Sequence, residues 1–222
     1  DIMTQVLSPT PEALALASQL LHDGQLVAFP TETVYGLGAN ALDAKAVLNI
    51  FAAKGRPADN PLIVHVYDRA QLTPLCEVSP LAEKLMDAFW PGPLTLILPR
   101  KPAIPDEVAA SLPTVAVRMS SHPVAAALLR ACKLPIAAPS ANRSGKPSPT
   151  TAHHVLVDMD GRIPLILDGG SCDVGVESTV LDVTSGAPCI LRPGGITKDM
   201  LESVLGHVDV AGSVLRPLQK GE

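Results

Sequence analysis

Short apolar segments alternate with segments of helical periodicity along most of the chain, and this alternation constrains the fold more than any other feature. Seven or eight segments have the length and composition of buried strands, and they span residues 26–29, 62–66, 94–98, 115–118, 135–138, 165–167, 179–183 and 189–192. Four to six helices are expected between them. The alternation predicts an α+β fold, layered as in α/β proteins, in which helices pack on a twisted sheet.

Helix starts are marked by residues whose side chains cap a helix N-terminus. Four such residues precede segments of helical periodicity: Thr10, Asp43, Ser79 and Thr197. Proline follows two of these caps, at Pro11 and Pro80, and proline suits the first position of a helix. An Ala/Leu-rich segment at residues 123–132 and a short segment after residue 150 predict two further helices.

The connection between the last two strand candidates predicts their relative direction. Residues 179–183 and 189–192 flank a Ser185-Gly186 turn, which is typical of a β-hairpin. An antiparallel hairpin beside strands that are joined through helices makes the sheet mixed, and we expect about seven strands in it. No repeat or linker divides the chain, so we expect one domain over residues 1–206 and a tail over residues 207–222.

Composition narrows the class of protein. Hydrophobic residues make up 47% of the 222 residues and aromatic residues only 3%, so the core must be aliphatic. The net charge of -5 argues against a protein whose main role is to coat nucleic acid. No apolar segment approaches the roughly 20 residues that cross a bilayer, and the chain opens with no secretory leader. The four cysteines, which lack CxxC or zinc spacing, are interpreted as buried thiols of a cytoplasmic protein.

Two loops carry groups that suit phosphate. Lys54 and Arg56 flank a glycine directly after a predicted helix, where Arg can bind phosphate oxygens in pairs and Lys acts as a point charge. The alternative is a solvated helix C-terminus, where basic residues offset the helix dipole. Residues 140–146 follow a predicted strand and carry hydroxyl, amide and cationic groups, as anion-binding loops of α/β proteins do. The alternative for this loop is an ordinary surface loop.

Two common nucleotide motifs do not fit the chain. The loop at residues 140–146 is not a Walker A loop, because no glycine lies five residues before Gly145 and Pro147 follows Lys146. Residues 36–41 superficially match a dinucleotide-binding fingerprint. Six residues separate them from the preceding strand, whereas that fingerprint needs its glycines in the turn itself.

His65 and Arg118 lie in or at the end of apolar strand candidates. A titrating or charged side chain is costly there unless it has a partner. A satisfied core histidine is one interpretation of His65, and an internal salt bridge is one of Arg118. Both residues also suit the carboxylate of a small ligand.

Hydroxyl groups and a further cation recur at strand ends, in residues 31–33, in residues 177–179 and at Arg192. His153 and His154 point about 100° apart on a helix, so they are poor joint metal ligands and are expected at the surface. No Ser-His-Asp or Cys-His set is apparent in the chain order. These patterns together predict a cleft that gathers cations and hydroxyl groups around a phosphorylated ligand.

Seven segments, taken in order, closely resemble the YrdC-like family of threonylcarbamoyl-adenylate synthases. They are PTETVYGLG, KGRPADNPL, WPGPLTLIL, VAVRMSSHP, APSANRSGKPSPT, ESTVLD and ILRPGGIT. The resemblance extends from about residue 6 to residue 196, and seven motifs in series are far more specific than any one of them. It implies a YrdC-like fold with a central cleft, in a catalytic domain that we place at residues 1–206.

The resemblance also implies a nucleotidyltransferase reaction. ATP, bicarbonate and L-threonine would give L-threonylcarbamoyladenylate and pyrophosphate, with Mg²⁺ assisting and no dedicated metal ligands in the protein. The product would pass to a downstream threonylcarbamoyl transferase that makes N6-threonylcarbamoyladenosine (t6A) at position 37 of tRNA. No membrane partner is implied.

Site residues follow from the same motifs. The resemblance assigns ATP binding to Lys54, Arg56, Asn60, Thr114, Ser140, Asn142, Ser148 and Arg192. It assigns L-threonine binding to Thr33, His65, Arg118, Ser178 and the backbone at Ala138. Lys54 and Arg56 are expected to be catalytic, by stabilising the charge of the phosphoryl group in transfer.

Longer members of this family continue through a linker, which covers the site, into a second domain. We interpret residues 207–222 as a tail or as the start of such a linker. Two other hypotheses remain. The first is a double-stranded RNA-binding module without catalysis, which the acidic net charge and few aromatic residues disfavour; weak RNA contact by the basic loops is left open. The second is a carbamoyl-adenylate activity, as in related domains of hydrogenase-maturation proteins.

Overall fold

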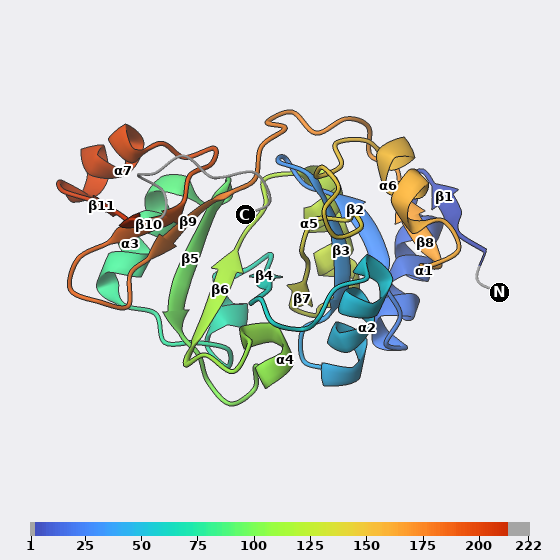
Figure 1. Cartoon of the computed structure of the whole chain (residues 1–222), viewed down its shortest axis with the longest axis horizontal. Coiled ribbons are helices and arrows are strands. Elements are labelled where there is room, and N and C mark those ends of the chain that lie inside the picture. Colours follow the sequence, from blue (N-terminus) through green and yellow to red (C-terminus); the bar gives the residue numbers. More distant parts are fainter. Residues whose placement is uncertain (1–2, 213–222) are drawn as a thin grey trace.

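The computed structural model describes residues 3–212, and within them one mixed sheet contains eleven strands. From edge to edge the strands follow the order β1-β8-β2-β3-β7-β4-β6-β5-β9-β10-β11 (Figure 1). Their bounds are β1 Gln5–Leu7, β2 Val27–Pro30, β3 Tyr35–Asn40, β4 Ile63–His65, β5 Leu94–Pro99, β6 Thr114–Arg118, β7 Ile136–Ala137, β8 Leu165–Leu167, β9 Thr179–Asp182, β10 Cys189–Arg192 and β11 Asp209–Val210. Segments far apart in the sequence therefore meet at the centre of the sheet.

Both strand directions occur, as expected for a mixed sheet. β4 runs parallel to β6, whereas β5 runs antiparallel to β6. β9 and β10 form the antiparallel hairpin that the Ser185-Gly186 turn predicts. The predicted α+β class is confirmed.

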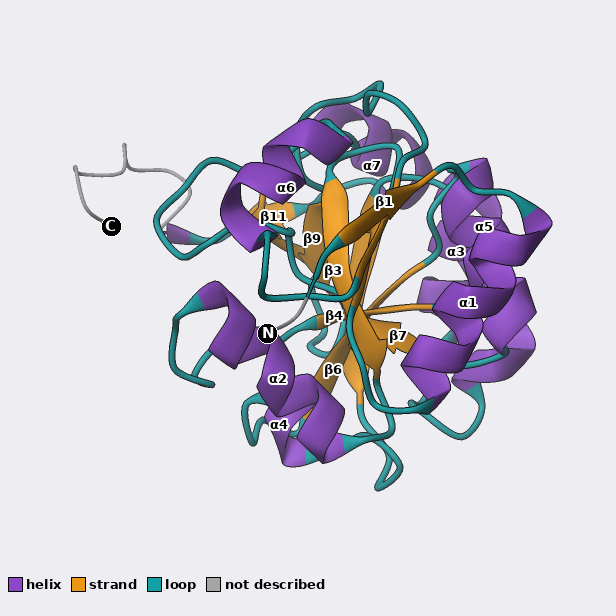
Figure 2. Cartoon of the chain, turned by 90° about the vertical axis from the view of Figure 1, so that its right-hand side faces the viewer, coloured by secondary structure: helices purple, strands orange, loops and turns teal. Residues whose placement is uncertain are grey.

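Helices cover both faces of the sheet. Figure 2 shows α1 and α5 on one face and α2, α4 and α6 on the other. One apolar cluster joins α1 and α5 to β2 and β8, and a larger cluster includes buried residues of α2, α3, α4 and α6. The helices are α1 Pro11–His22, α2 Ala44–Lys54, α3 Pro80–Phe89, α4 Asp106–Ala109, α5 Pro123–Cys132, α6 Ala152–Met159 and α7 Lys198–Leu205, with a 3₁₀ turn at Arg69–Leu72.

All four predicted N-caps are confirmed. Thr10 accepts a hydrogen bond from the backbone of Ala13, and Asp43 accepts two from the first turn of α2. Ser79 and Thr197 accept equivalent bonds at the starts of α3 and α7. Gly55 ends α2 with a φ of 70°, a left-handed conformation that glycine adopts without strain, and so turns the chain sharply after Lys54.

The expected number of about seven strands is wrong, because three strands lack the apolar pattern that identifies the others. β1 and β11 contain 3 and 2 residues and lie at the two edges of the sheet. Their neighbours in the sheet supply the pairing that defines them. β11 also lies within residues 207–222, which we expected to form a tail; residues 213–222 of that segment lie outside the described residues.

The third missed strand, β3, is disguised by its glycines. It pairs antiparallel with β2 along its first four residues. A Cβ atom on Gly38 would lie 2.9 Å from both Ile136 Cγ2 and Phe29 Cε1. Glycine is therefore required here for close packing between neighbouring strands. This finding agrees with the rejection of the dinucleotide fingerprint, since these glycines lie within a strand.

The remaining global expectations concern membranes and cysteines. None of the helices within residues 3–212 is long and apolar enough to cross a membrane. Cys76, Cys132 and Cys172 are buried free thiols, as expected, whereas Cys189 is only half-buried. Burial raises the pKa of Cys76 and of Cys172 to about 11, so both are protonated thiols at neutral pH.

Candidate functional site

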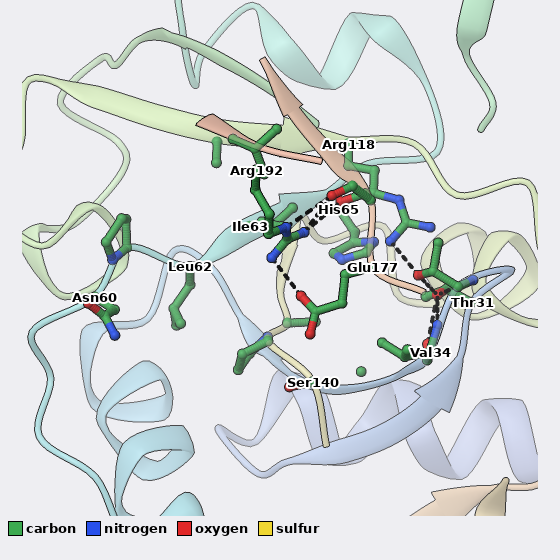
Figure 3. Close-up of a pocket in the computed structure, with 18 of the residues that line it drawn as sticks. Thr31, Val34, Asn60, Leu62, Ile63, His65, Arg118, Ser140, Glu177 and Arg192 are labelled. Atoms are coloured by element: carbon green, nitrogen blue, oxygen red, sulfur yellow. Dashed lines mark hydrogen bonds and ion pairs between the residues drawn. The ribbon is translucent and has the colours of Figure 1, made fainter. Parts of the chain in front are cut away.

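A cavity of about 330 Å³ lies where the central strands end (Figure 3). Nine of the thirteen residues that the sequence motifs assign to the site line it: Thr33, Arg56, Asn60, His65, Arg118, Ala138, Ser140, Ser178 and Arg192. In Figure 3, Arg118 and Thr31 lie at one side of the cavity and Asn60 at the other, with Arg192 and Glu177 between them. The predicted convergence of cations and hydroxyl groups in one cleft is therefore present.

The topology of the sheet explains this convergence. β4 and β6 are parallel neighbours, and their register places His65 directly beside Arg118. The turn between β2 and β3 is built locally, because Thr31 Oγ1 donates to Val34 O at 2.7 Å and lies 2.9 Å from Thr33 Oγ1. This turn holds the Thr33 hydroxyl against Arg118, whose Nη1 donates to it at 3.2 Å.

Arg118 forms a buried ion pair with Glu32, a residue that the sequence analysis missed. The side chains are only 5% and 9% exposed. Glu32 also accepts hydrogen bonds of 2.8 Å from the Ser120 hydroxyl and from the backbone and hydroxyl of Ser121. The internal salt bridge considered for Arg118 is confirmed. The signal in the sequence was the need of a strand arginine for a carboxylate, but nothing local identified Glu32 as that partner.

The same contacts set the charge of Glu32. Burial alone would raise the pKa of this carboxyl group. The Arg118 guanidinium and the hydrogen bonds from Ser121 and Ser120 outweigh burial and hold the pKa below its usual value. Glu32 is therefore ionised at neutral pH and compensates the buried cation.

His65 is neutral. Burial, together with the positive charge of Arg118, lowers its pKa to about 3. Its ring packs edge-on against Phe29 with 5.9 Å between ring centroids, and Nδ1 has no hydrogen-bond partner among the described residues. The interpretation of a fully satisfied core histidine is therefore wrong. Among the described residues, Arg118 and not His65 supplies the positive charge at this end of the cavity.

Lys54 lies in a different place from Arg56, although the motif treats them as a pair. Lys54 is 2% exposed, and its ammonium donates to the carbonyl oxygens of Ser140 and Asn142 at 2.5 and 2.8 Å. It does not line the cavity; it fastens the loop at residues 140–146 to the end of α2. Burial and the charge of Arg56 lower the Lys54 pKa to about 8. The solvated helix end considered for this residue is therefore wrong.

Arg56 does line the cavity. It is half-buried, and its guanidinium carbon lies 5.4 Å from the centre of the Phe51 ring, within the range of a cation–π contact. In the nearby loop, Ser140 lines the cavity and the Asn142 amide bonds the carbonyl oxygens of Arg143 and Lys146. Ser140 is thus part of the cavity wall and Asn142 orders the loop by hydrogen bonds, while residues 143–146 are exposed at the surface.

Arg192, at the end of β10, is held by residues just before β9. Its Nε and Nη2 donate to Ser178 O at 3.0 and 2.8 Å, and Nη1 pairs with Glu177 Oε2 at 2.6 Å. Glu177 Oε1 also accepts from the Ser148 hydroxyl at 2.7 Å. Ser148 thus reaches the cavity through Glu177, a lining residue that the sequence analysis missed.

Thr114 is the one predicted residue that these contacts leave apart. It begins β6, opposite Pro99, and does not line the cavity. His153 and His154 are exposed on α6, as predicted. Within residues 3–212 no group of three or more His, Cys, Asp or Glu side chains is arranged to hold a metal ion.

Comparison with known proteins gives a consistent result. A family model named Sua5_yciO_yrdC and described as "Telomere recombination" matches residues 19–194. The chain is 58% identical to a threonylcarbamoyl-AMP synthase of Bacillus subtilis over 93% of its own length and 61% of the relative's. It is 40% identical to a putative threonylcarbamoyl-AMP synthase of Mycobacterium tuberculosis over 85% of its length and 86% of the relative's.

Solved structures agree. A crystal structure of Pyrococcus abyssi Sua5 complexed with L-threonine superposes with a TM-score of 0.92 at 49% identity, over 99% of this chain and 65% of that one. Escherichia coli YciO, at 24% identity and a TM-score of 0.76, shares the fold. The chain spans about three fifths of the length of its relatives from B. subtilis and P. abyssi.

Proposed function

Because the chain belongs to the Sua5/YciO/YrdC family, we propose that its cleft joins L-threonine, bicarbonate and ATP into L-threonylcarbamoyladenylate and pyrophosphate. The observation that carries this proposal is the convergence of Arg56, Arg118, Arg192 and Ser140 on one cavity. Three guanidinium groups and a hydroxyl suit a ligand that combines a carboxylate with a polyphosphate. Relatives named threonylcarbamoyl-AMP synthase support the same reaction.

The amino acid occupies the Arg118 end in this proposal. Arg118 faces the carboxylate, while the hydroxyl groups of Thr33 and Ser178 and the backbone at Ala138 surround the rest of the ligand. Neutral His65 adds a polar ring without charge. Support comes from the P. abyssi protein, whose structure was solved with L-threonine and which is 49% identical to this chain.

The nucleotide occupies the end that contains Arg56, Asn60, Ser140 and Arg192, with Ser148 behind Glu177. The amine of threonine and bicarbonate form a carbamate and water. A carbamate oxygen then attacks the α-phosphorus, and the bond from that phosphorus to the pyrophosphate oxygen breaks. Such a transfer needs positioning and cationic stabilisation, which Arg56 supplies directly. Lys54 contributes by fixing the backbone of the wall at Ser140 and Asn142.

Mg²⁺ fits this site as a companion of the triphosphate. The described residues offer no carboxylate cluster for it, and Mg²⁺ at nucleotide sites is held largely by phosphate oxygens and water. It would supply charge neutralisation of the phosphates. The product would serve a downstream transferase that makes t6A in tRNA, in the cytoplasm, a compartment with which the free thiols agree.

The direct test is pyrophosphate release. The protein is incubated with ATP, Mg²⁺ and bicarbonate, with and without L-threonine, and pyrophosphate is followed over time. We expect release that requires L-threonine, and Arg56→Ala should lower it more than about tenfold. Arg130→Ala, which removes an exposed arginine from α5, is the matched control and should match wild type. Release that does not depend on L-threonine would exclude the proposed reaction.

The same assay distinguishes the proposed reaction from a carbamoyl-adenylate activity. Turnover with carbamoyl phosphate in place of L-threonine and bicarbonate would indicate the carbamoyl-adenylate reaction. Neither the described residues nor the comparisons favour a double-stranded RNA-binding module.

A further inference from the structure

Glu177 is the one acidic residue among the described residues that line the cavity. The other charged side chains of the lining are Arg56, Arg118 and Arg192, and Glu32 lies behind Arg118, outside the lining. A cavity that we propose to bind phosphate groups therefore contains one carboxylate beside three arginines. Like charges repel at short range, so this carboxylate opposes the ligand that the arginines attract.

The contacts of Glu177 explain what it does in the free protein. Its Oε2 accepts from Arg192 Nη1 at 2.6 Å, the dashed line between these two side chains in Figure 3. Its Oε1 accepts from the Ser148 hydroxyl at 2.7 Å. Arg192 and Ser148 are both donors that the motif resemblance assigns to ATP. A carboxylate that bridges a guanidinium and a hydroxyl group occupies them much as two oxygens of a phosphate group would.

The ion pair between Glu177 and Arg192 is weak enough for a ligand to replace the carboxylate. The Glu177 and Arg192 side chains are 36% and 37% exposed, and ion pairs with that degree of exposure to water are weak. Arg192 also donates two hydrogen bonds to Ser178 O that do not involve the Glu177 carboxylate. The donor is therefore oriented independently of the carboxylate, and the loss of the carboxylate does not dismantle the site.

The exchange involves the side chain of Glu177 and not its backbone. Gly195 N donates to Glu177 O at 3.3 Å. A Cβ atom on Gly194 would lie 2.3 Å from the same oxygen, so the two segments are in direct backbone contact. Only rotation of the side chain separates the carboxylate from Arg192.

We propose that Glu177 is an internal counter-anion that holds Arg192 and Ser148 in the free cleft and yields them to the phosphate groups of the ligand. It acts as a specificity residue, because a ligand must displace a carboxylate that is already bound to these two donors. Free pyrophosphate gains fewer contacts than ATP to offset that displacement, because it brings no adenosine and no α-phosphate group into the cleft. Glu177 therefore weakens retention of the pyrophosphate product. This inference rests on the proposed function, since it takes the cleft to bind phosphate groups.

The test is titration calorimetry with sodium pyrophosphate, without Mg²⁺, on wild type, Glu177→Gln and Asp173→Asn. Glutamine keeps the size of the side chain and removes its charge. Asp173 is an exposed carboxylate in the same segment that does not line the cavity, so its variant is matched in charge. We expect Glu177→Gln to bind pyrophosphate about tenfold more tightly than wild type, and Asp173→Asn to match wild type.

A second measurement uses the reaction itself. Pyrophosphate should inhibit L-threonine-dependent turnover by Glu177→Gln at about tenfold lower concentration than it inhibits wild type. Equal or weaker pyrophosphate binding by Glu177→Gln, or an equal gain in Asp173→Asn, overturns the inference while leaving the proposed function intact. Absence of binding to all three proteins also overturns the inference, whereas the proposed function is overturned separately, by pyrophosphate release that does not depend on L-threonine.

Discussion

The cleft contains two Glu–Arg ion pairs in opposite surroundings. At the L-threonine end Glu32 and Arg118 are 9% and 5% exposed, and toward the nucleotide end Glu177 and Arg192 are 36% and 37% exposed. The Glu32 carboxylate accepts from Arg118, Ser120 and Ser121, whereas among the described residues the Glu177 carboxylate accepts from Arg192 and Ser148. The buried pair is part of the framework that fixes an arginine. The exposed pair holds an arginine that water or a ligand can reach.

The largest expected difference between the two pairs is in stability. Glu32→Ala leaves a buried guanidinium without a counter-charge and should lower the free energy of unfolding by about 3–5 kcal/mol. Glu177→Ala should lower it by less than about 1 kcal/mol, because water solvates Arg192. Urea unfolding of both variants and wild type measures the two values. Similar losses in the two variants would remove the distinction between framework pair and exchangeable pair.

The next largest effect is a dependence of stability on pH, which we expect from His65 and Glu32 beside Arg118. The pKa of His65 is about 3 in the folded protein and 6.5 without burial, so the unfolded chain binds the extra proton first as pH falls. Stability due to neutral His65 is complete above pH 6.5 and declines toward pH 3, by at most about 1.4 kcal/mol per pH unit. Glu32, with its lowered pKa, adds a further decline below its usual value of 4.5.

His65→Asn isolates the histidine contribution. Its unfolding free energy, measured between pH 7 and pH 5 where Glu32 stays ionised, should change less than that of wild type. His154→Asn is the control, since His154 is exposed on α6. If the unfolding free energy of His65→Asn depended on pH as that of wild type does, the loss of stability at acid pH would not come from the buried, neutral His65 ring.

Lys54 extends the comparison, because it is a buried residue that holds the backbone beside the nucleotide end of the cleft. Lys54→Met removes the ammonium that holds Ser140 O and Asn142 O, so the wall beside the nucleotide loses its anchor. We expect ATP affinity to fall about tenfold with L-threonine affinity retained. Lys146→Met, at an exposed position of the same loop, is the control. Calorimetric titration with each ligand measures both affinities, and unchanged ATP affinity would contradict the anchoring role.

The smallest effects are expected from two conservative substitutions, each of which should weaken the binding of one ligand more than that of the other. Arg118→Lys keeps a positive charge but loses the planar fork, so L-threonine binding should weaken about fivefold, with ATP binding affected less. Arg192→Lys should show the reverse preference. If both variants weakened both ligands equally, the two ends would not be separate subsites.

Patterns within short stretches of sequence identified most of the helices and strands. Caps such as Thr10 and Asp43 act within one helical turn, and apolar segments such as residues 94–98 need only a sheet to pack in. β3 was missed because glycine at position 38 is required by the packing of Phe29 and Ile136, and Ile136 lies about a hundred residues away along the chain. A pattern read along the chain cannot reveal a steric demand made across the sheet.

Candidate site residues were identifiable because their motifs are contiguous and specific, and nine of them line one cavity. Their roles were less accessible. Lys54 and Arg56 are two residues apart in one motif, yet the left-handed turn at Gly55 sends one into the protein and the other to the cavity. Glu32 and Glu177 were missed because each is defined by the arginine it meets, 86 and 15 positions away.

The order of amino acids was sufficient for the class of fold, the helix starts and the set of groups available to a phosphorylated ligand, because these depend on periodicity and on side-chain chemistry. Folding alone established which carboxylate neutralises which arginine and how much water surrounds each pair. Coulomb interactions and desolvation act through space, and their strength follows burial and distance, which the sheet topology sets. That is why two Glu–Arg pairs of identical composition form a fixed framework around Arg118 and an exchangeable contact around Arg192.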